Sequence, residues 1–137
     1  MADTPENNPE ANKAVVLEFL EAFTTFDADV YEPYLTENPV YWVGMTKHEG
    51  REGFGRVAYF GRVLYPNGQE SRTIHHIVAE GDVVAVLMTI KAITNAGKDY
   101  ENTYAVHFEL EDGKIASQVE IMDFRVSNDK FDLSALA

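Results

Sequence analysis

Cysteine is absent from the sequence, and its absence excludes disulfides, thiolate metal sites and cysteine nucleophiles. Basic residues are also few, since 11 Lys and Arg stand against 23 Asp and Glu and the formal net charge is −12. Nucleic acids and anionic membrane surfaces attract proteins with positive patches. We therefore expect no nucleic acid and no membrane as a partner.

Long hydrophobic runs are missing as well. No apolar stretch approaches the ~18 residues of a transmembrane helix. The first twelve residues are acidic and lack the apolar core of a signal peptide. These features, together with the lack of cysteine, are typical of a cytoplasmic protein.

Several catalytic motifs are absent too. The sequence has no His-x-His or His-Glu-x-x-His spacing, no glycine-rich phosphate loop and no Gly-x-Ser-x-Gly nucleophile elbow. The adjacent residues His75 and His76 cannot easily bind one metal ion from one face of a strand, because neighbouring side chains point to opposite faces. We expect no metal site and no cofactor.

Apolar residues make up 45% of the 137 residues, which is enough for one hydrophobic core. Residues 1–8 are polar and predict a mobile tail. We expect one α+β domain over residues 9–125 and a C-terminal extension over residues 126–137.

The first half of the chain predicts helices. Asn8 and Pro9 are suited to the N-cap and first position of a helix, and apolar residues spaced three and four apart carry this amphipathic helix to Phe26. Asp27 then starts a shorter helical piece that Pro33 interrupts. The later elements expected here are a break at 36–39, a strand at 40–43, a turn at 46–50 and a helix at 51–65. In this helix Gly53, Gly55 and Gly61 are positions where a neighbouring element could pack closely.

From Gln69 onward the sequence predicts antiparallel strands joined by tight turns. The clearest is a hairpin over 100–124, where Asp112-Gly113 lies between two alternating runs and Gly accepts the positive φ of such a turn. Helices followed by strands are typical of an α+β fold. We expect a curved antiparallel sheet wrapped around the N-terminal helices, with a conical pocket at one end.

The stretch YENTYAVHFELEDGKIASQVEIMD, together with the order of helices and strands, resembles the nuclear transport factor two-like superfamily. Within it the chain resembles the branch of ketosteroid isomerase and the SnoaL-like polyketide cyclases, and its motif is most similar to the phenazine-biosynthesis A/B-type proteins. The resemblance implies an open-ended cone that forms a homodimer through its sheet. It also implies a pocket Glu at Glu120 and a pocket Tyr at Tyr100.

Other residues of these relatives have no counterpart in this chain. The third-helix His of the phenazine-type proteins falls near Val57. The buried acid of ketosteroid isomerase falls on Val106, and its general base falls near Tyr41 or Trp42. Steroid isomerisation by that mechanism is therefore not expected.

Glu120 is the leading catalytic candidate. Alternation places it on the same face of its strand as Met122, toward the expected pocket. A carboxyl group facing aromatic side chains is desolvated, which raises its pKa and lets it exchange a proton near neutral pH. The alternative is an exposed Glu120 on the solvent face, paired with a Lys or Arg.

Two further catalytic candidates are Asp123 and His76. Asp123 lies three residues after Glu120, and its alternatives are a capping role or a place in a dimer interface. Of His75 and His76, one should face inward and could serve as the acid–base partner of Glu120. The alternative is that both histidines only form hydrogen bonds in or on the sheet.

A substrate-binding set follows from the same alternation and from the aromatic content. Tyr and Asn side chains can hold a substrate oxygen by hydrogen bonds, while aromatic and Met side chains can form apolar walls. Ordinary sheet and core packing is the alternative for each of them. The set is Tyr100, Asn102, Tyr104, Trp42, Tyr31, Tyr59, Met88 and Met122, with Phe60 as a further wall.

These residues suit an enzyme without a cofactor that moves protons on a small, apolar, carbonyl-bearing metabolite, as an isomerase, cyclase or dehydratase. The family resemblance adds secondary metabolism as a setting. A small-molecule binding protein with the same pocket and no chemistry is the main alternative. A pure interaction module that uses its sheet as a dimer surface is the third.

Overall fold

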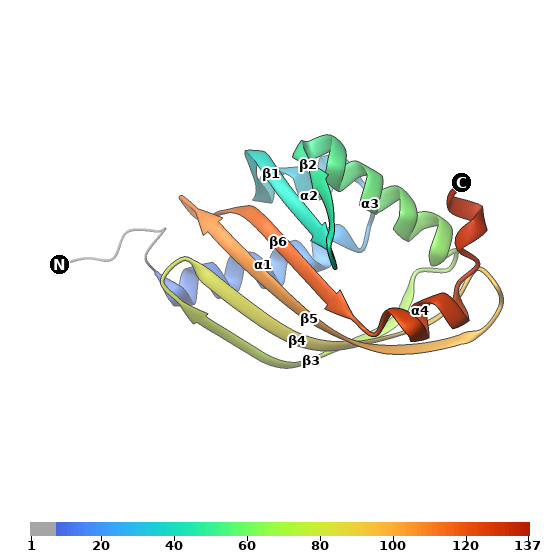
Figure 1. Ribbon diagram of the computed structural model, residues 1–137. Helices are drawn as coiled ribbons and strands as arrows, with labels where there is room; N and C mark the ends of the chain where they lie inside the picture. Colours follow the sequence, from blue (N-terminus) through green and yellow to red (C-terminus); the bar gives the residue numbers. More distant parts are fainter. Residues whose placement is uncertain (1–7) are drawn as a thin grey trace.

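The computed structural model describes residues 8–137 and contains one curved, unclosed six-stranded sheet with helices on its concave side (Figure 1). The strand order is β2-β1-β6-β5-β4-β3, with β1 and β6 parallel and all other neighbours antiparallel. The expected α+β fold is confirmed. The strands are β1 (Leu35–Val43), β2 (Thr46–Glu49), β3 (Gln69–Glu80), β4 (Val83–Ile93), β5 (Asp99–Glu111) and β6 (Lys114–Met122).

Within residues 8–137, four α-helices and two short 3₁₀ helices accompany the sheet. The α-helices are α1 (Pro9–Phe23), α2 (Ala28–Tyr31), α3 (Gly50–Leu64) and α4 (Phe124–Lys130), and the 3₁₀ helices are η2 (Glu32–Tyr34) and η3 (Leu133–Leu136). No helix among residues 8–137 is long and apolar enough to cross a membrane. Of the tail expected at 1–8, residues 1–7 lie outside the described part of the chain.

Helix α1 begins where the sequence predicts. The Asn8 side chain accepts a 3.1 Å hydrogen bond from the Ala11 amide, and Pro9 is the first helical residue. The helix ends at Phe23, three residues earlier than expected, and Phe26 has a positive φ of 55°. Phe19 is fully buried, and its ring contacts four other aromatic rings of the core.

The expected break at 36–39 is wrong, because β1 already begins at Leu35. The parallel pairing of β1 with β6 shifts register between Leu35 and Val40. Pro39 therefore lies in an irregular stretch where its missing N–H removes no regular ladder bond. The turn expected at 46–50 is also wrong, since residues 46–49 form β2 and pair with β1.

The β5–β6 hairpin is confirmed. Asp112 and Gly113 both have positive φ, 52° and 76°, which is the geometry of a two-residue type I′ turn. Along β5, buried and exposed residues alternate from end to end. The inner face of the hairpin therefore presents Tyr100, Asn102 and Tyr104 toward the helices.

Two of the three α3 glycines at which we expect a close neighbour do have one. A Cβ added at Gly53 would lie 2.5 Å from the carbonyl carbon of His48, and one added at Gly61 would lie 2.3 Å from the Phe26 ring. At Gly55 the nearest atom is the Tyr31 hydroxyl oxygen at 4.0 Å, an ordinary contact.

Gly53 and Gly55 thus form a matched pair for substitution. Gly53→Ala should destabilise the fold by about 1–3 kcal/mol, because backbone must move to admit the new methyl group. Gly55→Ala should stabilise it by roughly 0.5–1 kcal/mol through helix propensity. Chemical denaturation measures both, and equal effects at the two positions would contradict the close approach at Gly53.

Candidate active site

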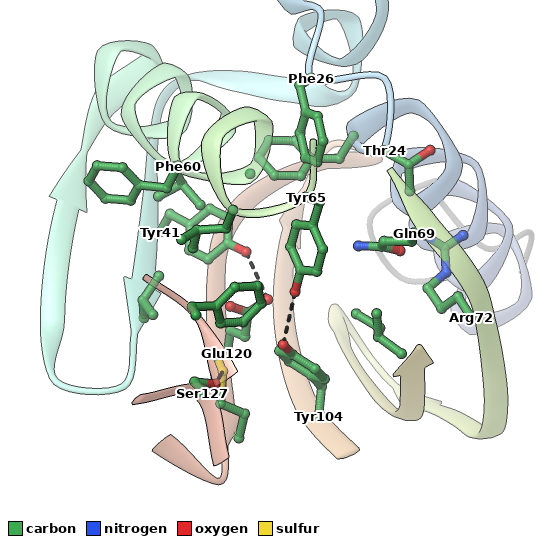
Figure 2. Close-up of a pocket in the computed structure, with 18 of the residues that line it drawn as sticks. Thr24, Phe26, Tyr41, Phe60, Tyr65, Gln69, Arg72, Tyr104, Glu120 and Ser127 are labelled. Atoms are coloured by element: carbon green, nitrogen blue, oxygen red, sulfur yellow. Dashed lines mark hydrogen bonds between the residues drawn. The ribbon is translucent and has the colours of Figure 1, made fainter. Parts of the chain in front are cut away.

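The concave face of the sheet encloses a cavity of about 260 Å³, near the lower end of the ~300–1,000 Å³ typical of ligand pockets. Helices α1 and α3, the sheet and the segment after β6 all contribute side chains, most of them apolar (Figure 2). The polar residues that line it include Tyr41, Tyr65, Tyr104, Gln118 and Glu120.

Glu120 lies on the inner face of β6, in register with Val43 of β1 and Val106 of β5. Its Oε1 atom accepts a 3.0 Å hydrogen bond from the Tyr41 hydroxyl. Burial raises the pKa of Glu120 to about 7, and the hydrogen bond from Tyr41 offsets part of this effect. The residue as a whole is half-buried because its accessible surface faces the cavity. Glu120 can therefore both donate and accept a proton near neutral pH.

Three tyrosine hydroxyls form a chain that ends at the cavity. The Tyr100 hydroxyl contacts the Tyr104 hydroxyl, which lies 3.2 Å from the Tyr65 hydroxyl (Figure 2). Behind them, Asn102 Nδ2 donates to the Tyr100 oxygen at 2.9 Å. When Tyr100 donates to Tyr104 and Tyr104 donates to Tyr65, each of these oxygens accepts one bond. The Tyr65 proton then stays available to a ligand in the cavity.

Two of these tyrosines, Tyr65 and Tyr104, remain protonated. Burial raises the pKa of Tyr65 and of Tyr104, and the neighbouring tyrosines and the Glu120 carboxylate act mainly in the same direction. A neutral phenol that keeps its proton is a hydrogen-bond donor to an oxygen that gains negative charge. The cavity therefore holds a proton-exchanging carboxyl group and a committed donor.

The segment after β6 closes one side of the cavity. Phe131 is buried, with its ring centroid 5.2 Å from that of Tyr65 and 4.6 Å from that of Tyr100. Asn95, in the β4–β5 turn, exchanges two 2.9 Å hydrogen bonds with the Asp132 backbone. The residues expected to form an extension at 126–137 thus help to build the pocket wall.

Part of the expected site comes together in this cavity. Glu120, Tyr104, Met88 and Met122 line it, as does Phe60. Tyr100 and Asn102 lie one layer behind, where they are buried in the hydroxyl chain and do not form the wall.

His76 does not reach the cavity, and the expectation that one of the two histidines faces inward is wrong. The pairing of β3 with β4 shifts register between Ile74 and His76. Such an irregularity breaks the alternation, and both His75 and His76 are exposed. His75 Nε2 lies 2.8 Å from the Thr89 hydroxyl on the outer face.

Asp123 is a helix cap and lies outside the cavity. Its exposed carboxylate accepts hydrogen bonds from the Arg125 and Val126 amides at 3.0 and 3.4 Å, at the start of α4. In the structure Asp123 therefore has the capping role that was one of its two alternatives.

Three aromatic residues expected in the pocket wall lie elsewhere. Trp42 is on the outer face, where Lys47 Nζ lies 5.7 Å from its ring. Tyr31 is buried in the core, 4.8 Å from the Phe23 ring, and Tyr59 is 49% exposed on α3. Trp42 neighbours Tyr41 on one strand, so only one of the two can face inward.

Sequence reasoning missed Tyr65 and Gln118 as pocket residues and gave Tyr41 no role. Tyr41 and Gln118 are register partners on β1 and β6, but the parallel pairing of these distant strands leaves no local signal. Tyr65 follows the last residue of α3. The direction of its side chain depends on how this helix packs on the sheet, which local sequence does not reveal. Within residues 8–137, no three His, Asp or Glu side chains converge in a metal-ligand arrangement.

Comparisons with known proteins agree on the fold. The family model described as the SnoaL-like domain matches residues 16–118. A structure from Jannaschia sp. CCS1, proposed to be a SnoaL-like polyketide cyclase, has a TM-score of 0.80 and 16% identity over 95% of this chain and 96% of that one. An NTF2-like protein from Burkholderia xenovorans has a TM-score of 0.75 and 15% identity over 90% and 97% of the two chains.

A second NTF2-like protein, from Anabaena variabilis, has a TM-score of 0.74 and 21% identity, covering 89% of this chain and 95% of its own. At such identities these structures establish the fold alone. No curated protein has significant sequence similarity to the chain. The finer resemblance to the phenazine-biosynthesis A/B-type proteins gains no support from these matches.

Proposed function

The chain belongs to the SnoaL-like domain family, and we propose that it is a cofactor-free acid–base enzyme acting on a small, apolar carbonyl compound. The observation that carries the proposal is the Glu120 carboxyl group, whose pKa burial raises to about 7, in an apolar cavity that the Tyr65 hydroxyl also lines. An acid–base group is most effective when its pKa is close to the working pH.

In the proposed step the Glu120 carboxylate removes a proton from the carbon next to the substrate carbonyl. The C–H electrons form a carbon–carbon double bond, and the carbonyl oxygen becomes an enolate that accepts a hydrogen bond from Tyr65. Protonated Glu120 then returns the proton to another carbon in an isomerisation. In a dehydration it protonates a leaving hydroxyl group, which departs as water.

A cyclisation uses the same groups. The enolate carbon attacks a second carbonyl carbon of the same molecule and forms a carbon–carbon bond. The oxygen of that second carbonyl takes the proton from Glu120. All three reactions need only one proton-exchanging group and one oxyanion donor, which are the groups that line this cavity.

Proton exchange on a simple ketone tests the proposal without knowledge of the natural substrate. We expect the protein to accelerate deuterium incorporation into the methyl group of 2-acetylnaphthalene in D₂O near neutral pD, followed by ¹H NMR. Calorimetric binding of the ketone without any acceleration would favour the alternative of a non-catalytic binding protein. Neither binding nor exchange would contradict both.

We also propose that two copies of the chain associate through the outer face of the sheet. Leu87, Ala105 and Ile121 are register neighbours across β4, β5 and β6, and Ile121 is 55% exposed. Exposed apolar rows of this kind favour protein contacts. Sedimentation should show a dimer that Ile121→Asp dissociates, and a monomeric wild type would contradict this arrangement.

A further inference from the structure

We infer that Gln118 selects the substrate: the cavity takes carbonyl compounds that also carry a hydroxyl or N–H donor near the carbon at which Glu120 acts. The inference rests on the proposed function for the identity of the site. It goes beyond that function because it assigns a second polar group to the ligand and a residue that recognises it.

Gln118 is almost fully enclosed but faces the cavity. It is 2% exposed, lines the cavity and lies on the inner face of β6, two residues before Glu120. Its Oε1 atom is buried and has no hydrogen-bond donor among the described residues. A buried amide oxygen of this kind has lost its water and gained no partner, which native proteins seldom tolerate.

Neither register partner of Gln118 supplies the missing donor. Tyr41 is the register partner of Gln118, but its single hydroxyl proton is already given to Glu120. On the other side, Gln118 faces Phe108 of β5, which has no donor. Because Oε1 of Gln118 itself has almost no accessible surface, the terminal amide must rotate to turn this oxygen toward the cavity, where a donor of the bound molecule can reach it close to Glu120.

The other buried acceptors without partners separate into two groups. Asn12 Oδ1 and Asp82 Oδ1 are not part of the cavity wall. Gln69 Oε1 does belong to the wall, but it comes from β3, which β5 and β4 separate from β6. Figure 2 shows Gln69 across the cavity from Glu120. Gln69 is only half-buried, so a small side-chain movement can bring its amide to water.

Gln69 therefore provides a matched control for Gln118. Gln118→Met and Gln69→Met each remove one amide from the same cavity and keep a side chain of similar length. The probes are 2-acetylnaphthalene and its monohydroxylated derivatives, which share the carbonyl group and differ by one donor. Titration calorimetry measures each dissociation constant, and circular dichroism confirms that each variant is folded.

For the wild type we expect at least one hydroxylated derivative to bind about ten- to a hundredfold more tightly than the parent ketone. Gln118→Met should reduce this preference to near unity, whereas Gln69→Met should keep it. If Gln118→Met does not fold, Gln118→Leu takes its place. Equal binding of all derivatives to the wild type, as expected if only water pairs with Gln118, overturns the inference, and so does a preference that survives Gln118→Met.

The outcome also separates this inference from the proposed reaction. A Gln118-dependent preference in a protein that does not accelerate deuterium exchange would refute the acid–base chemistry and leave the recognition intact. Deuterium exchange without any preference for a hydroxylated derivative would refute the recognition and leave the chemistry intact.

Discussion

Replacing Glu120 with Gln is expected to slow deuterium exchange into 2-acetylnaphthalene by about 10²–10⁴-fold, the usual contribution of a positioned acid–base group. Gln keeps the size and hydrogen-bonding capacity of the side chain, so the Tyr41 hydroxyl retains an acceptor. What Gln cannot do is take up a proton. The loss should therefore appear in the exchange rate far more than in the calorimetric affinity for the ketone.

The pH dependence of the wild-type exchange rate is a second, independent test of whether Glu120 is the acid–base group. Glu120 acts first as a base, so the rate should rise with pH, with a midpoint near its pKa of about 7, and then level off. Glu120→Gln should lack this rise.

Tyr41→Phe is the matched control for the exchange experiment. It keeps the carboxyl group but removes a hydrogen bond that lowers the Glu120 pKa, so its midpoint should move to higher pH. A wild-type rate that Glu120→Gln leaves unchanged would remove Glu120 from the mechanism.

The fold could be predicted because its signals are local. The Asp112-Gly113 turn marks the hairpin, and strict alternation along β5 decides which of its side chains face inward. Alternation alone puts Glu120 on the same face as Met122, but it does not say which face that is, because the pairing of β5 with β6 shifts register between Glu109 and Leu110, between the turn and Glu120. The inward positions on β5 therefore follow from neighbouring residues and the two-residue period of a strand, whereas the inward face of β6 does not.

The rest of the site depends on contacts between distant segments. A register shift in β3 turns both His75 and His76 outward. The residue types in this stretch do not indicate that shift. Tyr65 meets Tyr104 only because α3 docks on the sheet. The segment with Phe131 closes the cavity because Asn95 in the β4–β5 turn forms hydrogen bonds with its backbone. Hydrophobic periodicity does not predict a tertiary contact of this kind.

Glu120 should also leave a mark on stability, which needs no substrate to measure. Its pKa is raised from 4.5 to about 7 in the folded protein, so the folded state holds this proton more tightly than the unfolded chain does. The associated stability is fully present below pH 4.5 and is lost as the pH rises through 7. At ~1.4 kcal/mol for each factor of ten in proton affinity, the loss amounts to about 3 kcal/mol.

Other groups titrate over the same range, so the contribution of Glu120 must be isolated by comparison with variants. Urea denaturation at a series of pH values should show that Glu120→Gln gains up to about 3 kcal/mol relative to the wild type between pH 4.5 and pH 7.5, because Gln stays neutral throughout. Glu109→Gln, an exposed carboxylate on the outer face of β5, should instead follow the wild type. If the two variants show the same pH dependence, the Glu120 carboxyl group is not desolvated, and the argument for its role in proton transfer loses its physical basis.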